Sequence, residues 1–398
     1  MERAIIHSDL KKQEIQPQYL LDNYLDLLSK DIKKMLPKDS LQNASCPVTG
    51  EKEVQDSFLK MGMQYQVSQT LGNIYLSPRP TMEILKQFYQ ESSARKFWLT
   101  ELWPKTQAAR QEKIILPQLE WVQGFIKQFS QERELLLVEY IPNHWGYYNS
   151  SKELFAGSHF TLVDPLFDPD IPNMDLQNSY ITDEVTDSSM DAVFLFEALD
   201  RSVEPLDLLQ KVFNSLKSGG LCFITCLLSS GFEVKMLGHK SEIFVPPERM
   251  NIFSYKGLKA LIEKLNCFEI LEFSTPSVLD IPNVIKQLDV INNPEFFKYI
   301  FKDREDPEIL NSFQDFGTGK TIYKLPSSPE QIVQARNAKI YKDLDAKGVK
   351  VLLSNSYTDF VREELYSNYI IDEVSANRNI NSKASKRGAI SEALVRNF

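Results

Sequence analysis

The sequence is poor in the residues that build disulfide frameworks, metal clusters and membrane spans. Its 398 residues include four histidines and four cysteines, at positions 46, 222, 226 and 267. Cysteines placed in this way indicate neither a disulfide framework nor a metal cluster, so we expect no metal and a reducing, cytoplasmic location. No apolar run approaches the roughly 20 residues that span a bilayer, and we expect no membrane partner.

Net positive charge is missing as well. The 54 acidic side chains outnumber the 45 of lysine and arginine, which gives a net charge of −9. General affinity for nucleic acids rests on basic surface that neutralises phosphates, so the overall composition argues against it. With 42% hydrophobic residues the chain can bury a full core, and its length predicts two or three structural units.

A strand, a helix and a second strand are predicted within residues 190–231. Val193–Phe196 is a continuous apolar run, which is typical of a strand buried on both faces of a parallel sheet. Apolar residues then recur at helical spacing over 206–216, and Gly219-Gly220 is expected to end the helix. Leu221–Leu228 is predicted as the second strand, joined to the first by a right-handed crossover.

This unit resembles the middle of the class I S-adenosylmethionine (SAM) dependent methyltransferases. Their "FDVV" and "LKPGG" patterns are matched here by Met190–Val193 and by Leu216–Gly220. The resemblance implies an α/β protein with a Rossmann-like class I methyltransferase sheet, a helical and degenerate zinc-ribbon N-terminal lobe, and a C-terminal βα segment. It also implies SAM as cofactor, although a fold can persist after its site is lost.

The predicted domain organisation has four parts. The boundaries are 1–45 for an amphipathic helical leader, 46–130 for the degenerate ribbon and helical lobe, 131–310 for the Rossmann-like domain, and 326–398 for the C-terminal segment.

The ribbon region carries one of the four cysteines that a zinc site would need. Cys46 lies where a C-x-x-C knuckle begins, but Thr49 occupies the second ligand position. The matching segment, Ser68–Gly72, has no cysteine. Because two thiolates must reach one tetrahedral ion from each tight turn, a lobe without metal is predicted.

Residues 46–300 resemble a bacterial methyltransferase subgroup linked to surface-sugar and natural-product methylation. Its "PRP…FY…W…R.EKI" pattern is matched at Arg79, Tyr89, Trp98 and Arg110. The resemblance implies a sugar or other small molecule as substrate. These four side chains either frame an anionic substrate or pack as aromatic helices with solvated arginines.

The turn that would receive the methionine part of SAM is altered. Relatives follow the acid, here Glu139, with G-x-G-x-G, whose glycines let the backbone approach the cofactor. The glycine positions hold Ile141, Asn143 and Trp145, and Gly146 comes one residue late. Asn143 can adopt a left-handed conformation at modest cost, whereas β-branched Ile141 is a poor substitute. Glu139, Asn143 and Gly146 stay cofactor-binding candidates, and weak SAM binding is predicted.

Acidic residues are retained at two other strand ends. Asp164 follows a predicted strand, where the resemblance implies contact with ribose hydroxyls; an ordinary Asp-Pro turn is the alternative. Glu197 is a further cofactor-binding candidate. Arg201 and Arg249 stand where relatives have histidines, and arginine cannot accept a proton. Asp200 is therefore the candidate catalytic base.

The last 70 residues closely resemble the C-terminal end of the D12 class of DNA adenine N6-methyltransferases. Val351–Ser356 matches their "VLLSNS", and "NINSK…RG" follows at 379–388. Those enzymes also carry F-x-G-x-G for SAM and D-P-P-Y for the flipped adenine, and this chain has neither. The segment predicts either nucleic-acid contact through Lys383, Lys386 and Arg387 or a solvated basic strand-loop-strand.

Three functions follow from these patterns. The first is a SAM-dependent methyltransferase, or a divergent descendant of one, acting on a sugar or other small molecule. The second is a catalytically inactive methyltransferase-like protein with a binding or regulatory role. DNA adenine N6-methylation is the third, from the C-terminal resemblance alone. Gly317–Thr321 invites a phosphate-loop interpretation, but the required glycine is replaced by Gln314, and irregular structure is predicted there instead.

Overall fold

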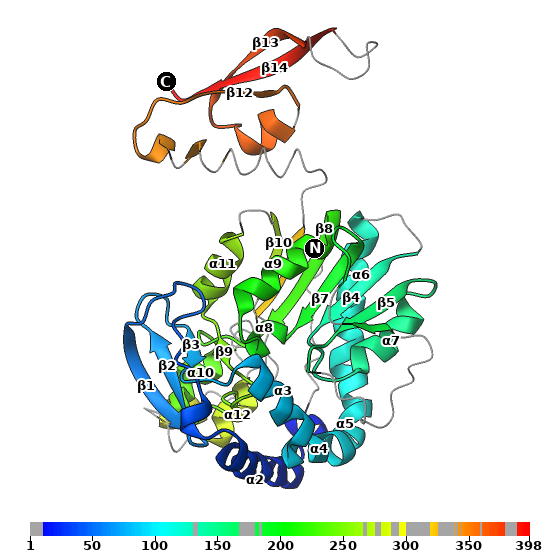
Figure 1. Ribbon diagram of the computed structural model, residues 1–398, viewed down its shortest axis with the longest axis vertical. Coiled ribbons are helices and arrows are strands. Elements are labelled where there is room, and N and C mark those ends of the chain that lie inside the picture. Colours follow the sequence, from blue (N-terminus) through cyan, green and yellow to red (C-terminus); the bar gives the residue numbers. More distant parts are fainter. Residues whose placement is uncertain are drawn as a thin grey trace. The chain divides into compact units, whose positions relative to one another are not determined.

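The computed structural model divides the chain into two compact units. The first comprises residues 1–264 and 270–324, and the second comprises 325–398 with the short segment 265–269. The structure describes residues 11–129, 134–166, 180–182, 185–265, 269–274, 280–287, 294–299, 319–324, 338, 341–342, 344–358, 360–378 and 388–398. Each unit is shown in Figure 1.

The N-terminal lobe of the first unit is helical and carries a small sheet. The helices are α1 (Lys12–Ile15), α2 (Gln18–Met35), η1 (Lys38–Ser40), α3 (Met82–Glu91), α4 (Ser93–Phe97) and α5 (Trp103–Arg110), with π-helical turns η2 (Trp98–Leu102) and η3 (Gln111–Ile115). The strands are β1 (Val54–Lys60), β2 (Met63–Ser68) and β3 (Ile74–Leu76). β9 (Asn251–Ile252), from far along the chain, pairs with β3 and completes this four-stranded sheet.

The amphipathic leader folds as its spacing predicts. Leu20, Tyr24, Leu28 and Ile32 of α2 recur every four residues and are at most 4% exposed. They pack in one core with β2, β3, α3 and η2. Asp31, also buried, accepts hydrogen bonds from Ser92 Oγ and Ala94 N, both at 2.8 Å. The leader thereby fixes the start of α4.

A seven-stranded sheet forms the rest of the first unit, in the order β10-β11-β8-β7-β4-β5-β6. The strands are β4 (Leu136–Tyr140), β5 (His159–Val163), β6 (Tyr180–Thr182), β7 (Met190–Phe196), β8 (Leu216–Cys226), β10 (Glu269–Ser274) and β11 (Gly319–Lys324). Strands β8, β7, β4, β5 and β6 are parallel to one another, whereas β11 is antiparallel to β8.

Further described helices belong to the first unit. They are α6 (Leu116–Phe129), α7 (Gly146–Leu154), α8 (Ala198–Arg201), α9 (Pro205–Ser215), α10 (Phe232–Leu237), η5 (Gly238–Lys240), α11 (Tyr255–Glu263), α12 (Asp280–Lys286) and α13 (Pro294–Lys298). α6 and α7 share an aromatic core with β4, β5, β7 and β8; Figure 1 draws these helices in cyan and blue-green beside the strands. Among the described residues, no helix combines the length and apolar character needed to cross a bilayer.

Two predictions about this sheet were wrong. The helix after β7 ends at Ser215, and Leu216–Gly220 already belongs to β8, where Gly219 has φ +79° and Lys217 pairs with Asp191 at 2.7 Å. Gly319–Lys324, predicted as irregular, is strand β11. Its pairing partner is a distant strand, so the local sequence gave little sign of it.

The second unit has a three-stranded antiparallel sheet. β12 (Leu352–Ser356) and β13 (Ile370–Arg378) both pair with β14 (Gly388–Arg396), which lies between them. A π-helical segment, η8 (Phe360–Leu365), follows β12. One sheet face packs on Ala338, Tyr341, Val361 and Tyr366. The predicted strand-loop-strand is confirmed in its strands, whereas Lys383, Lys386 and Arg387 lie outside the described residues.

Candidate functional site

The candidate site lies where the strand order of the large sheet reverses. The chain runs outward from β4 to β5 and β6, then returns to the other side of β4 with β7 and β8. Ligands of open α/β sheets bind at this switch point, outside the carboxyl ends of the strands. The segments that follow β4, β5 and β7 therefore build the site. Helices α3 and α4 of the N-terminal lobe lie at this end of the sheet, near α8 (Figure 1).

The turn after β4 is closed by backbone and side-chain hydrogen bonds. Ile141 has φ +50°, the left-handed conformation that a glycine would adopt without strain. Its N–H donates to Val163 O at 2.8 Å, and its carbonyl accepts a hydrogen bond from Arg201. The left-handed residue of this turn is thus the β-branched Ile141, although Asn143 could adopt that conformation at lower cost. Arg201 holds this strained turn in place.

Side chains fill the space next to Gly146. A Cβ atom there would overlap Ile115 Cδ1, and it would lie 3.1 Å from both His144 Nδ1 and Trp103. Trp145 is partly buried against the aromatic core of α6 and α7. The methionine part of SAM needs a turn that the cofactor can approach closely, and here protein atoms occupy that approach.

Stacked aromatic rings connect the N-terminal lobe with the end of β7. Ring centroids are 5.4 Å apart for Trp98 and Trp103, 4.2 Å for Trp103 and His144, 5.3 Å for His144 and Tyr147, and 4.4 Å for Tyr147 and Phe196. Burial, aided by the charge of Arg110, lowers the pKa of His144 to about 3. His144 is therefore neutral at physiological pH, and its Nδ1 accepts a hydrogen bond from Gly146 N at 3.2 Å.

Arg249 joins the two acids that follow β7. Its Nη2 lies 2.5 Å from Glu197 Oε2, and its Nη1 lies 3.2 Å from Asp200 Oδ2. Glu197 has φ +55°, so the backbone after β7 also bends through a left-handed residue. Burial raises the pKa of Asp200 to about 8 despite the Arg249 charge, whereas at Glu197 that charge outweighs burial and lowers the pKa to about 2. At neutral pH Arg249 thus forms an ion pair with ionised Glu197 and donates a hydrogen bond to protonated Asp200.

The other two acidic candidates are also largely removed from solvent. Glu139 is 1% exposed, and burial raises its pKa to about 8 although Arg201 opposes the shift. Its Oε2 has no hydrogen-bond partner among the described residues. Asp164 follows β5, caps a turn by accepting from Leu166 N at 3.0 Å, and has a pKa raised by burial. The structure therefore brings Glu139, Asp164, Glu197 and Asp200 to one edge of the sheet.

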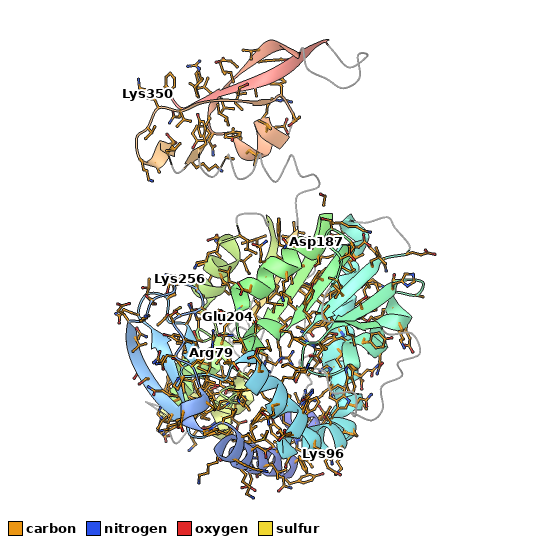
Figure 2. The ribbon with its side chains drawn as sticks, viewed as in Figure 1. Arg79, Lys96, Asp187, Glu204, Lys256 and Lys350 are labelled. Carbon is orange, nitrogen blue, oxygen red and sulfur yellow. The ribbon has the colours of Figure 1, made fainter. Side chains whose placement is uncertain are left out.

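The four residues of the sugar-methyltransferase pattern do not share one set of contacts in the structure. Tyr89 and Trp98 lie against the guanidinium of Arg95, at 5.7 and 5.0 Å from the ring centroids. Arg110 donates to Ile15 O at 2.7 Å and to Thr106 Oγ1 at 3.1 Å. Arg79 instead pairs at 3.1 Å with Glu204, which precedes α9. Figure 2 labels both residues.

The ribbon contains no group that resembles a zinc site. Cys46 is buried and accepts a long hydrogen bond, 3.6 Å, from Asn73 Nδ2. Ser68 and Thr70, in the segment where the second knuckle would stand, bond to Asn73 N and to Glu51. Within the described residues, no three side chains of histidine, cysteine, aspartate or glutamate could hold a metal.

SAM fits this edge only in part. Asp164 keeps a carboxylate at the end of β5, where ribose hydroxyls are held in doubly wound sheets. At the methionine end, Arg201 takes the Ile141 carbonyl, and Trp103, Ile115 and His144 crowd Gly146. The residues at that end do not fit the cofactor.

Arg95 and His144 were missed by sequence reasoning. Arg95 Nη2 donates to Asn143 O at 3.0 Å, so α4 holds Asn143, one of the cofactor candidates of this turn. His144 could have been suspected, because it is one of four histidines and lies between Glu139 and Gly146. No local pattern places Arg95 there.

The first unit has the Rossmann-like fold of the class I SAM-dependent methyltransferases. Solved structures that overlap with it include phosphoethanolamine N-methyltransferase 2 of Haemonchus contortus with phosphomonomethylethanolamine and S-adenosylhomocysteine (SAH), at 12% identity and a TM-score of 0.40 over 69% of this chain and 71% of that one. Coclaurine N-methyltransferase, bound to N-methylheliamine and SAH, overlaps at 12% identity and a TM-score of 0.34 over 52% of this chain and 70% of that one. These TM-scores are too low to support the fold assignment, which rests on the strand order of the sheet and its reversal at β4.

Two curated relatives are similar over a short stretch. The type II methyltransferase M1.LlaDCHI of Lactococcus lactis subsp. cremoris is 43% identical over 65 residues, 16% of this chain and 22% of that protein. The type II methyltransferase M.MjaIII of Methanocaldococcus jannaschii is 44% identical over 66 residues, 16% of this chain and 23% of that protein. The chain thus spans less than a quarter of the length of these relatives, consistent with the D12-like C-terminal segment. No family model matches the chain.

Proposed function

We propose that the first unit descends from SAM-dependent methyltransferases whose substrates were sugars or other small molecules. It binds a small molecule at the switch point of its sheet and does not transfer methyl groups. The observation that carries this proposal is the Arg249–Glu197–Asp200 cluster, which ties up both acids at the end of β7.

The chemistry of these residues supports binding over catalysis. Methyl transfer to a hydroxyl calls for an unprotonated base within hydrogen-bond reach of the acceptor. Asp200 is fully buried and, with a pKa of about 8, keeps its proton at neutral pH. His144 is unprotonated, but a pKa of about 3 makes it a weak base, and its Nδ1 is already an acceptor for Gly146.

Calorimetric titration of the full chain with SAM and with SAH tests the proposal. We expect binding much weaker than a dissociation constant of about 1 μM, which corresponds to about 8 kcal/mol. Asp164→Asn and the exposed control Asp207→Asn should then behave alike. Micromolar binding that Asp164→Asn alone abolishes would show a working cofactor site and overturn the proposal.

A second candidate, DNA adenine N6-methylation, is favoured by the short similarity to type II methyltransferases. Holding a flipped adenine requires a stacking aromatic and acceptors for its amino group, and the chain lacks the D-P-P-Y motif that supplies them. We therefore expect no methyl transfer from labelled SAM to unmethylated duplex DNA. Turnover that both Glu197→Ala and Asn355→Ala abolish would establish this function instead.

A further inference from the structure

Three arginines around the turn after β4 bond to neutral oxygens instead of carboxylates. Arg201 donates to Ile141 O, Arg95 to Asn143 O, and Arg110 to Ile15 O and Thr106 Oγ1. Elsewhere in the described chain, Arg79, Arg249 and Arg396 each pair with an aspartate or glutamate at 3.2 Å or less. The three arginines around this turn thus differ from the ion-paired ones, including Arg249 of the same site.

Arg201 is the most deeply buried of the three. Its side chain is 5% exposed, no described carboxylate lies within 4.0 Å of it, and its Nε has no hydrogen-bond partner among the described groups. A buried guanidinium without an ion pair is strongly unfavourable, and an unsatisfied N–H adds to that cost. Glu139, the acid at the end of β4, does not compensate for it, because burial keeps Glu139 protonated at neutral pH.

Arg95 presents its donors toward the same turn. Its Cζ lies 5.7 Å from the ring centroid of Tyr89 and 5.0 Å from that of Trp98, and its Nη2 donates to Asn143 O. Burial lowers the pKa of Arg201, and the nearby charges of Arg249 and Arg95 lower it further. Several cations therefore converge here, with Glu197 and Asp164 as the acids that face them.

We propose that Arg201, assisted by Arg95 and Arg110, binds an oxyanion, either a carboxylate or a phosphate, carried by the small molecule of the proposed function. Such a group satisfies the free Nε of Arg201 and offers planar or tetrahedral oxygens that a guanidinium fork recognises well. The inference rests on the proposed function and specifies the class of its ligand.

The test compares inorganic phosphate and succinate with chloride at equal ionic strength, using the melting temperature of the full chain. A specific oxyanion site raises the melting temperature with phosphate, with succinate or with both, and the stronger anion identifies the source. Arg201→Gln keeps an N–H for Ile141 O but removes the charge, and we expect it to weaken the apparent affinity at least about tenfold. Arg201→Lys keeps the charge but lacks the paired N–H donors of a guanidinium, so its anion affinity should lie between those of the wild type and Arg201→Gln.

Arg79→Gln is the matched control, because Arg79 is also buried in the first unit but is paired with Glu204; Figure 2 labels both residues. Its anion affinity should stay within about twofold of the wild type, since charge-assisted bonds to the anion are intact. If Arg201→Gln does not fold, Arg95→Gln replaces it with the same expected direction.

Two results would overturn the inference. One is the absence of stabilisation by either anion beyond that of chloride, and the other is equal affinity in the wild type and Arg201→Gln. Neither bears on the proposed function, which fails only if SAM binds tightly or methyl transfer occurs. If a neutral sugar bound the protein and neither phosphate nor succinate did, the proposed function would hold and only this inference would be wrong.

Discussion

At the scale of single residues, Arg249 has the largest electrostatic role in the site. It offsets the charge of Glu197 and donates a hydrogen bond to fully buried Asp200. Replacing it by Gln leaves ionised Glu197 without its cation, which should cost about 1–3 kcal/mol of unfolding free energy, because the Glu197 side chain is 36% exposed and solvent screens the lost pair. Urea unfolding measures the loss. The more exposed Lys217→Gln, which breaks the pair with Asp191, should cost less than about 1 kcal/mol; similar losses for both would argue against this role.

The raised pKa of Glu139 predicts how stability depends on pH. Between its ordinary pKa of 4.5 and the native value of about 8, the unfolded chain has lost a proton that the folded chain retains. Stability contributed by this group therefore falls as pH rises through that range. The charged groups that face it are Arg201 of α8 and Asp164 after β5.

Glu139→Gln removes the titration and keeps the shape of the side chain. Its stability relative to the wild type should increase steadily from pH 5 to pH 8, when unfolding curves are measured at several pH values. Asp200 contributes in the same direction in both proteins, so the difference isolates Glu139. For the exposed control Glu153→Gln, the free energy of unfolding should depend on pH as in the wild type. The same dependence for Glu139→Gln would show that the native pKa of Glu139 is ordinary.

At the scale of elements, the contact between α2 and α4 positions the arginine and aromatic groups of the lobe. Buried Asp31 binds Ser92 Oγ and Ala94 N, and the Ser92 hydroxyl in turn accepts from Arg95 N at 3.0 Å. Asp31→Ala should lower the unfolding free energy by about 2–3 kcal/mol, because hydrogen bonds to a charged group are lost in the interior. The exposed Asp26→Ala should change it by less than about 0.5 kcal/mol, the worth of its helical pair with Lys30.

A second measurement separates this structural role from a general loss of stability. Under conditions where Asp31→Ala is fully folded, its tryptophan fluorescence should change, because Trp98 directly follows α4, whose start Asp31 fixes. Unchanged fluorescence with the predicted loss of stability would show that Asp31 stabilises the lobe without positioning the stack.

At the scale of the whole molecule, each unit has its own buried core. Val193 is fully buried in β7, and Val395 is fully buried in β14 of the second unit. Domains with separate cores commonly unfold in separate steps. In calorimetry of the full chain, Val193→Ala should shift one transition and Val395→Ala the other, each losing about 0.5–2 kcal/mol by removal of buried methyl groups. A single transition moved equally by both substitutions would contradict independent unfolding.

The sequence by itself determined the elements whose signal is local. The apolar runs of β4, β5 and β7 and the periodicity of α2 are dictated by burial on both faces of a strand or on one face of a helix, so their positions could be predicted. The altered glycine turn and the two arginines in histidine positions were also visible in the sequence. The start of β8 and the whole of β11 were not, since pairing with distant strands overrides local preference there.

Only the tertiary structure decided what the candidate site consists of. Arg95, His144, Arg201 and Arg249 come from four segments separated by long stretches of chain, and they meet because α4, the turn after β4, α8 and the loop before β9 converge at one switch point. The protonation of Glu139 and Asp200, and the absence of a described carboxylate beside Arg201, follow from burial at that point. Burial and charge proximity are properties of the folded arrangement, which no local stretch of sequence encodes.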